Sequence, residues 1–237
     1  MRERPISAVP KPVLLLLALS FFVQISWFLA QPSKIAKAED LMPAPSLSTL
    51  KITSFGEPIA MAKGMMLYLQ AFDNQAGRNL SFQQLDYIKL EAWLTRILEL
   101  DPAGQYPLFA ASRLYGEIPD ENKQRRMLDF VYRQFLLDPN HRWKSMTHAV
   151  SLARHRLHDM PLARKYAHAI LLHATSSDVP GWAKQMEIFL LEDMNELQSA
   201  KILLGGLLQS GQITDKYEYR FLEQSLTELE QKIKMNP

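Results

Sequence analysis

Apolar residues recur at positions 0, 3, 4, 7 and 8 of four nine-residue segments spread along the chain. The segments begin at Leu90, Met127, Ala163 and Ala200, so successive starts are 37, 36 and 37 residues apart. Positions with this spacing share one face of an α-helix. Every one of them is apolar except Gln134. The pattern therefore predicts four amphipathic helices that repeat at a nearly constant interval.

A second helix is predicted between these segments, and each time it begins close to an aromatic residue. The aromatic residues are Tyr106, Trp143, Trp182 and Tyr217. Asp101-Pro102 and Asp138-Pro139 end two of the preceding helices, because proline disfavours helix in the residue before it and suits the first turn of a new one. One hairpin cannot bury its apolar face alone, so the sequence predicts an all-α stack of about four αα-hairpins.

Residues 152–170, "LARHRLHDMPLARKYAHAI", resemble a tetratricopeptide repeat. Asp159, Ala163 and Ala167 fall where that family places its turn residue and its two close-packing positions, and Ala200 has the same role one unit later. The resemblance covers roughly residues 58–234. It departs from the family in its longer period and in lacking the Trp-Leu-Gly-Tyr signature.

That resemblance implies an αα-hairpin solenoid with a right-handed superhelix. It also implies binding of a protein or peptide along the concave face, which the first helix of each pair builds.

The N-terminus has the composition of a membrane anchor. Residues 1–11 carry Arg2, Arg4 and Lys11 against one acid, and residues 13–30 carry no charge. Eighteen helical residues span roughly 27 Å, close to the thickness of the bilayer hydrocarbon. We therefore predict a cytoplasmic tail (residues 1–11), one transmembrane signal anchor (residues 12–30), and a C-terminal domain on the periplasmic side of the inner membrane.

A cleaved signal peptide is the alternative interpretation of the same segment. Ala36-Lys37-Ala38 fits the small-residue cleavage pattern, although it follows the apolar run by several residues. Cleavage after Ala38 would release a soluble periplasmic binding protein that begins at Glu39. Determining the first residue of the mature chain distinguishes the two.

A Pro-rich tether is predicted to follow the anchor at residues 31–57, with Pro32, Pro43 and Pro45 among serines and lysines. Its segment "TLKITSF", residues 49–55, has the composition of a short strand. The repeat domain is predicted to cover residues 58–237 and to begin with an apolar helix at Pro58, whose methionines fill the core.

Basic residues and histidines gather between residues 141 and 168, where we predict a docking surface for an acidic protein segment or an anionic envelope polymer. The candidate residues are Arg142, Lys144, His148, Arg154, His155, Arg156 and Lys165. Protonation of the histidines would strengthen such docking near pH 6. A solvated surface with no partner is the alternative, since charge runs are commonly solubilising.

Metal binding and catalysis find little support in the sequence. His141, His148 and His155 are seven residues apart, about 10 Å along a helix, so they cannot share one ion. The chain has no cysteine, which excludes disulfides, thiolate metal ligands and cysteine nucleophiles. No nucleophile elbow or phosphate loop is present. We predict no catalytic, cofactor or metal site; an envelope enzyme with an unrecognised site is an alternative.

Two other features carry structural predictions. Gly205-Gly206 lies inside an otherwise good helix and predicts either the close approach of a neighbouring helix or a kink. Trp182 is predicted to pack at the start of its own helix.

The sequence as a whole predicts a membrane-anchored scaffold or adaptor. Its partners would be proteins of an envelope assembly and the membrane, through residues 12–30. Nucleic acid is not predicted, because the net charge is only +2.

Overall fold

The structure is a computed structural model, and its chain forms two compact units, Met1–Ala38 and Glu39–Pro237. The described residues are 9–30, 40–72, 74–75, 78–79, 81–211, 213 and 215–235.

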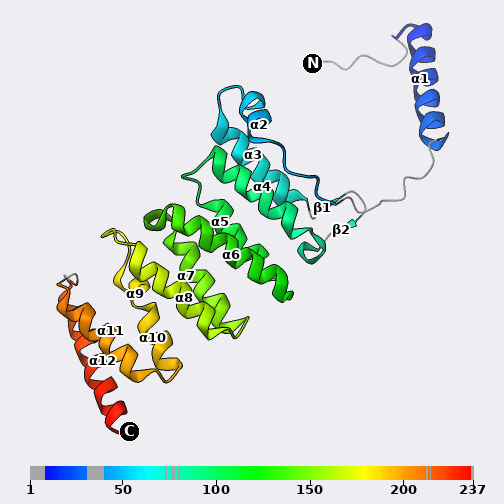
Figure 1. Cartoon of the computed structure of the whole chain (residues 1–237). Coiled ribbons are helices and arrows are strands. Elements are labelled where there is room, and N and C mark those ends of the chain that lie inside the picture. The colour runs from blue at the N-terminus through cyan, green and yellow to red at the C-terminus, as the bar shows by residue number, and fades with distance from the viewer. Residues whose placement is uncertain are drawn as a thin grey trace. The chain divides into compact units, whose positions relative to one another are not determined.

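The first unit contains helix α1 (Lys11–Ala30), which lies where the sequence predicts an anchor (Figure 1). None of its residues is buried, and it is apolar on every side. By length and composition α1 can cross a membrane. The candidate cleavage pattern at residues 36–38 lies outside the described residues.

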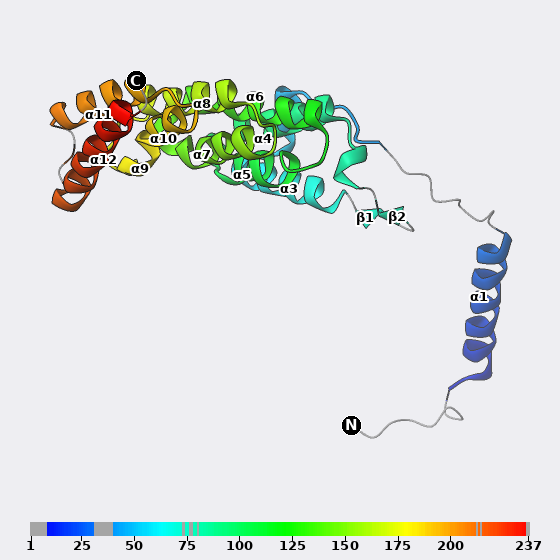
Figure 2. The same cartoon turned by 90° about the horizontal axis from the view of Figure 1, so that it is seen from below.

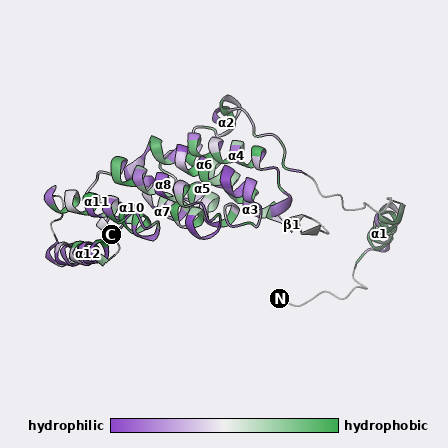
Figure 3. Cartoon of the chain, turned by 60° about the horizontal axis from the view of Figure 1, so that its bottom comes forward, coloured by the Kyte–Doolittle hydropathy of each residue, from purple (hydrophilic) through white to green (hydrophobic). Residues whose placement is uncertain are grey.

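The second unit is all-helical apart from one antiparallel pair of two-residue strands. Its longer helices carry hydrophobic and hydrophilic residues side by side (Figure 3). In chain order the elements are α2 (Leu47–Thr53), α3 (Pro58–Ala71), β1 (Asn74–Gln75), β2 (Arg78–Asn79), the 3-10 helix η2 (Phe82–Gln84), α4 (Tyr87–Leu100), α5 (Tyr106–Ala110), the π-helix η3 (Ala111–Tyr115), α6 (Glu121–Leu137), α7 (Pro139–His155), α8 (Met160–His173), α9 (Gly181–Lys184), α10 (Met186–Asp193), α11 (Leu197–Gln209) and α12 (Lys216–Met235).

Aspartate caps begin several of these helices. The side chains of Asp86, Asp120 and Asp159 accept backbone N–H groups in the first turns of α4, α6 and α8. Each cap satisfies a donor that has no partner within the helix. The helix starts are thus set locally by residue type.

The Asp-Pro stops have different consequences. Asp138 ends α6, and Pro139 begins α7 directly after it. Asp101 ends α4, but α5 begins only at Tyr106, after a turn in which the Gly104 N–H donates to the Asp101 carbonyl. The predicted helix ends are confirmed at both places.

The turn between the helices also repeats. His158 precedes α8 and Asn195 precedes α11, and these two residues lie 37 positions apart. Both adopt a left-handed backbone, with φ of 50° and 58°. Asparagine and histidine are among the non-glycine residues that most often adopt it. The interval of the hydrophobic pattern is therefore present in the backbone as well.

The repeated columns form the buried side of α4, α6, α8 and α11. The first and third columns are buried in all four helices: Leu90, Met127, Ala163 and Ala200, and Leu94, Val131, Ala167 and Leu204. The second column is buried as Trp93, Phe130 and Tyr166 but only half-buried as Leu203. None of the twenty positions is exposed. The predicted apolar faces are confirmed.

Neighbouring helices in the sequence pack against one another along the unit (Figures 1 and 2). Contacts join α3 to α4, α6 to α7, α7 to α8 and α11 to α12, and further contacts join α4 to α6 and α8 to α10. Two cores result. The larger runs from Leu41 to Leu190, and the buried residues of the smaller belong to α10, α11 and α12.

Part of the predicted tether belongs to the helical unit. Residues 47–53 form α2, whereas the sequence suggested a strand there. Leu41 and Leu50 are buried in the larger core, and the Trp93 indole Nε1–H donates to the Met42 carbonyl at 2.8 Å. The packed part of the chain therefore begins before Pro58. The strand prediction is wrong because Ser46 caps a helix at this place.

The glycine pair in α11 is not a site of close approach. A Cβ atom added at Gly205 or at Gly206 would have no atom within 4 Å outside the local helix. The prediction of a close neighbouring helix is therefore wrong. The pair lies inside the continuous helix α11, beside a groove between α8 and α11.

Candidate interaction surface

A groove of about 550 Å³ lies between α3, the end of α4 and the start of α5. Ala62, Met66, Ile97 and Pro107 contribute apolar side chains to its lining. The groove is open to solvent and is lined mainly by apolar atoms. Its volume lies in the range of about 300–1,000 Å³ that is usual for ligand pockets. We call it the α3–α5 groove.

The turn after α4 shapes one wall of the α3–α5 groove. A Cβ atom on Gly104 would lie 2.9 Å from Asp101 Oδ2 and 3.1 Å from the Asp101 carbonyl oxygen. A larger residue would therefore force the Asp101 carboxylate to shift and would crowd the Asp101 carbonyl, so glycine suits this close turn. Pro107 then begins α5 without needing a backbone donor. The sequence "DPAGQYP" thus determines where the groove ends.

Large apolar side chains are exposed at the groove. Leu67 of α3 is 64% exposed, and Tyr106 of α5 is partly exposed beside it. The Gln70 side-chain amide donates to the Tyr106 hydroxyl and so joins the two helices. The rings of Tyr106 and Phe109 stack with centroids 5.8 Å apart. Aromatic side chains that are held in place but exposed are typical anchors of protein interfaces.

Two opposite charges accompany these apolar groups. Lys63 lines the groove from α3 and Asp101 lines it from the end of α4. Such groups orient a bound segment, whereas the apolar lining supplies the affinity. The arrangement can hold a segment with bulky apolar side chains. It has no pair of groups poised for proton transfer or nucleophilic attack.

The other aromatic residues that open helices have different surroundings. Trp143 and Trp182 pack edge to face with ring centroids 5.7 Å apart. Trp182 therefore packs on α7, as well as beginning α9, and half of its surface stays exposed. Tyr217 is exposed on α12. These residues do not join the α3–α5 groove.

Arg142 is not available to a partner, so its assignment to a docking surface is wrong. Its guanidinium is buried and donates to the Gln134 carbonyl (2.8 Å), the Gln134 side chain (3.0 Å) and the Pro102 carbonyl (3.0 Å). Burial lowers the pKa of Arg142. Arg142 therefore ties the α4–α5 turn to α6 and α7.

Three more of the predicted basic residues have partners within the chain. His148 Nε2 lies 3.1 Å from Glu117 Oε1, and Arg154 Nη2 lies 2.5 Å from Asp193 Oδ2. The Lys165 ammonium lies 4.6 Å from the centre of the Tyr132 ring. Burial and the positive charge of Arg113 lower the pKa of His148, despite its contact with Glu117. The lowered pKa of His148 weakens the gain of charge near pH 6 that was predicted at this position.

Lys144, His155 and Arg156 are exposed, but they lie toward opposite ends of α7. Lys144 is near its start, and His155 and Arg156 are at its end, roughly 17 Å away at the rise of an α-helix. Of the seven predicted residues, Arg142 is thus the one that is buried, and the others stay a predicted surface.

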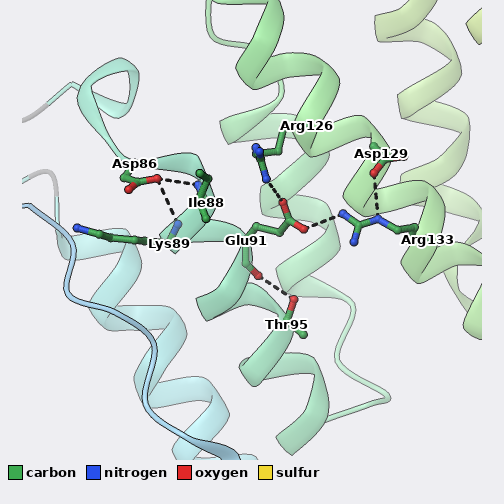
Figure 4. Close-up of polar contacts among 8 residues, drawn as sticks. All are labelled: Asp86, Ile88, Lys89, Glu91, Thr95, Arg126, Asp129 and Arg133. Atoms are coloured by element: carbon green, nitrogen blue, oxygen red, sulfur yellow. Dashed lines mark hydrogen bonds and ion pairs between the residues drawn. The ribbon is translucent and has the colours of Figure 1, made fainter.

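Ion pairs connect the helices that carry the repeated columns. Glu91 of α4 accepts from Arg126 (3.0 Å) and Arg133 (2.7 Å) of α6, and Arg133 also contacts Asp129 (Figure 4). The hydrogen bond to Glu91 raises the pKa of Arg133. Arg125 of α6 contacts the Asp159 cap of α8 at 2.7 Å. These charges are engaged in holding helices together.

The histidines do not form a metal site in the part of the chain that the structure describes. No group of three or more histidine, aspartate or glutamate side chains there is placed to hold a metal ion.

Comparisons with models of protein families, with characterised proteins and with solved structures return no match.

Sequence reasoning missed the α3–α5 groove, although it recognised α3 as an apolar helix. The signal was the spacing of Ile59, Lys63 and Leu67, which lie four residues apart and share the exposed side of α3. Ile59 and Leu67 place two bulky apolar side chains on a solvent-facing stripe, a pattern that also occurs at Tyr217 and Phe221 of α12. The α5 wall could not be anticipated, because it depends on the fold of the Asp101–Pro107 turn.

Proposed function

We propose that this protein is a membrane-anchored adaptor whose helical unit binds a segment of a protein partner in the α3–α5 groove. The observation that carries the proposal is the apolar groove itself, with Leu67 and Tyr106 exposed at its edge. Burying these side chains against a partner would remove apolar surface from water, the dominant favourable term in protein association.

The fold proposal is a solenoid of tetratricopeptide-like hairpins. It is supported by the recurring buried columns, by the αL turns at His158 and Asn195, and by the contacts of α4 with α6 and of α8 with α10. In such a stack α3 and α5 are first helices of successive pairs. The α3–α5 groove then lies on the face that this class of fold uses for peptides.

The occupant we propose is a peptide segment with one or two large apolar side chains and an acidic residue nearby. The apolar side chains would enter between Met66 and Pro107, and the acid would face Lys63. Lys63 is exposed, so this pairing would contribute more to orientation than to affinity.

The membrane proposal rests on α1 and its basic leader. Arg2, Arg4 and Lys11 favour an N-terminus in the cytoplasm, because positively charged flanks stay on that side. The helical unit would then lie on the periplasmic side of the inner membrane. A protein of an envelope assembly is the class of partner that this position allows.

The groove is tested with the full-length chain in a mild detergent and a random peptide library. Selected peptides should be rich in leucine, phenylalanine or tryptophan and should bind at least tenfold more weakly to Leu67→Glu. Ile88→Glu is the matched control, because Ile88 is also 64% exposed but lies outside the groove. Equal binding to both variants would refute the groove as the site.

The anchor is tested by isolating the mature chain from membranes. A chain that keeps α1 and resists alkaline carbonate extraction is expected. A mature N-terminus at Glu39 would refute the anchor and favour the released binding protein instead.

A further inference from the structure

The turn between α2 and α3 has an unusual backbone. Within the described residues, the non-glycine positions with positive φ are Phe55 (50°), His158 and Asn195. His158 and Asn195 lie in turns between packed repeat helices and belong to residue types that tolerate this conformation. Phe55 is bulky, and for such a residue a left-handed backbone is a real departure that costs free energy.

Phe55 also gains little from contacts with the described residues. Its side chain is 94% exposed, and Ile52, one turn earlier, is 77% exposed. We call Ile52 and Phe55 the apolar tip. The tip therefore combines backbone strain with two large apolar side chains in water. Among the residues of the second unit that the structure describes, no packing contact offsets either cost.

The base of the turn is firmly held. Leu50 is buried in the larger core, and the Ser54 N–H donates to the Leu50 carbonyl at 2.9 Å. The Ser54 hydroxyl donates to the Lys51 carbonyl at 2.8 Å, and the Glu57 N–H donates to the Ser54 carbonyl. These bonds fix the backbone beneath the tip, so its side chains remain directed away from the core.

The covalent chain limits how far the helical unit can lie from α1. Only ten residues separate Ala30, the end of α1, from Leu41, which is fully buried. Even when fully extended, the eleven Cα–Cα steps from Ala30 to Leu41 reach no more than about 40 Å. If α1 crosses a bilayer, the point where the chain enters the helical unit must stay within that distance of the membrane surface.

We propose that the apolar tip docks into the interface of the membrane that α1 crosses, and this proposal rests on the membrane anchoring proposed above. Phenylalanine and isoleucine enter the boundary between headgroups and acyl chains, where their apolar surface leaves water. The exposed Lys51 on α2 can approach lipid phosphates. The tip thus gives the helical unit a second membrane contact, which restricts how the α3–α5 groove is presented.

The absence of cysteine makes a direct test simple, because a single introduced cysteine can carry a fluorescent label. The full-length chain is labelled at Phe55→Cys, at Phe221→Cys on α12, or at Leu16→Cys in α1. Each is reconstituted in vesicles of phosphatidylethanolamine and phosphatidylglycerol that contain a lipid-borne quencher. We expect strong quenching at positions 16 and 55, and at least threefold weaker quenching at position 221.

The outcomes separate the two proposals. Quenching at position 16 together with equally weak signals at positions 55 and 221 would overturn tip docking and leave the anchor intact. No quenching at position 16 would overturn the anchor itself. As a second measurement, Phe55→Ser in a chain labelled at Ile52→Cys should reduce quenching at least twofold, with unchanged circular dichroism. Unaltered quenching would show that Phe55 does not hold the tip in the membrane.

Discussion

The helices α8 and α11 occupy equivalent places in the repeat, but they are buried to different extents. In α8 four of the five repeated positions, Ala163, Tyr166, Ala167 and Ile170, are buried, and Leu171 is half-buried. In α11 only two of the five repeated positions, Ala200 and Leu204, are buried, whereas Leu203, Leu207 and Leu208 are half-buried. One hydrophobic pattern thus gives a tightly packed helix in one place and a partly covered one in another.

The reason is what lies beside each helix. Helix α8 belongs to the larger core, which continues through α6 and α7. Helix α11 belongs to the smaller core, and a groove of about 450 Å³ separates it from α8. Leu172 and Ile202 are exposed beside this groove. An amphipathic pattern therefore determines that a helix has a side to bury, but the neighbouring side chains determine how completely it is buried.

Deleting a large core side chain should separate the two regions most clearly. Phe130→Ala removes a fully buried ring from α6 and should lower the free energy of unfolding by about 3–5 kcal/mol. Leu204→Ala should loosen only α10, α11 and α12, because Leu204 belongs to the smaller core. Hydrogen exchange of the full-length chain in detergent measures both effects.

The expected pattern is loss of protection across α4 to α8 for Phe130→Ala and confined loss for Leu204→Ala. If Leu204→Ala increased hydrogen exchange in α4 and α6 as much as in α11, the two cores would unfold as one unit. The contrast between the two regions would then be wrong.

Removing the buried guanidinium of Arg142 should lower the free energy of unfolding more than breaking the ion pair between Arg154 and Asp193 of α10. Arg142→Met leaves the Gln134 and Pro102 carbonyls without their donor and should cost about 2 kcal/mol. Arg154→Met breaks only the half-exposed pair with Asp193 and should cost about 0.5 kcal/mol. Thermal denaturation followed by circular dichroism checks the difference, and equal costs would contradict the structural role of Arg142.

Acid should weaken both regions, through different carboxylates. Hydrogen bonds from Arg125 and from the Leu162 N–H lower the pKa of Asp159 at the start of α8, and a hydrogen bond from Lys201 lowers the pKa of Glu230 on α12. A lowered pKa in the folded state means that each contribution is present above the unfolded pKa, about 4, and is lost as pH falls below it.

Asp159→Asn keeps an acceptor for the Leu162 N–H but loses the charge pair with Arg125. Melting temperatures measured between pH 6 and pH 3 should therefore fall less steeply for Asp159→Asn than for the unaltered chain. An identical slope would show that Asp159 contributes no pH dependence.

The parts that sequence predicted well are those that depend on near neighbours along the chain. The columns that begin at Leu90, the stop at Asp138-Pro139 and the apolar α1 each follow from local spacing and residue type. The parts it missed depend on contacts between distant segments. Arg142 is buried because Pro102, 40 residues away, supplies an acceptor. The α3–α5 groove likewise needs the Gly104 turn to lie beside α3, which periodicity does not encode.

A small effect of the opposite sign tests the packing of α11 directly. Gly205→Ala and Gly206→Ala should each raise the free energy of unfolding by about 0.5–1 kcal/mol, because alanine favours helix and the added Cβ meets nothing within 4 Å. Gly116→Ala is the control in the larger core, where the Cβ would lie 3.0 Å from the Ala111 and Ser112 carbonyl oxygens and 3.2 Å from Leu152. That change should destabilise the chain. Denaturant titration measures the free energy of unfolding of all three variants. Destabilisation at Gly205 or Gly206 would mean that a neighbouring helix does approach α11 closely. The contrast between the tightly packed α8 and the open-sided α11 would then not hold.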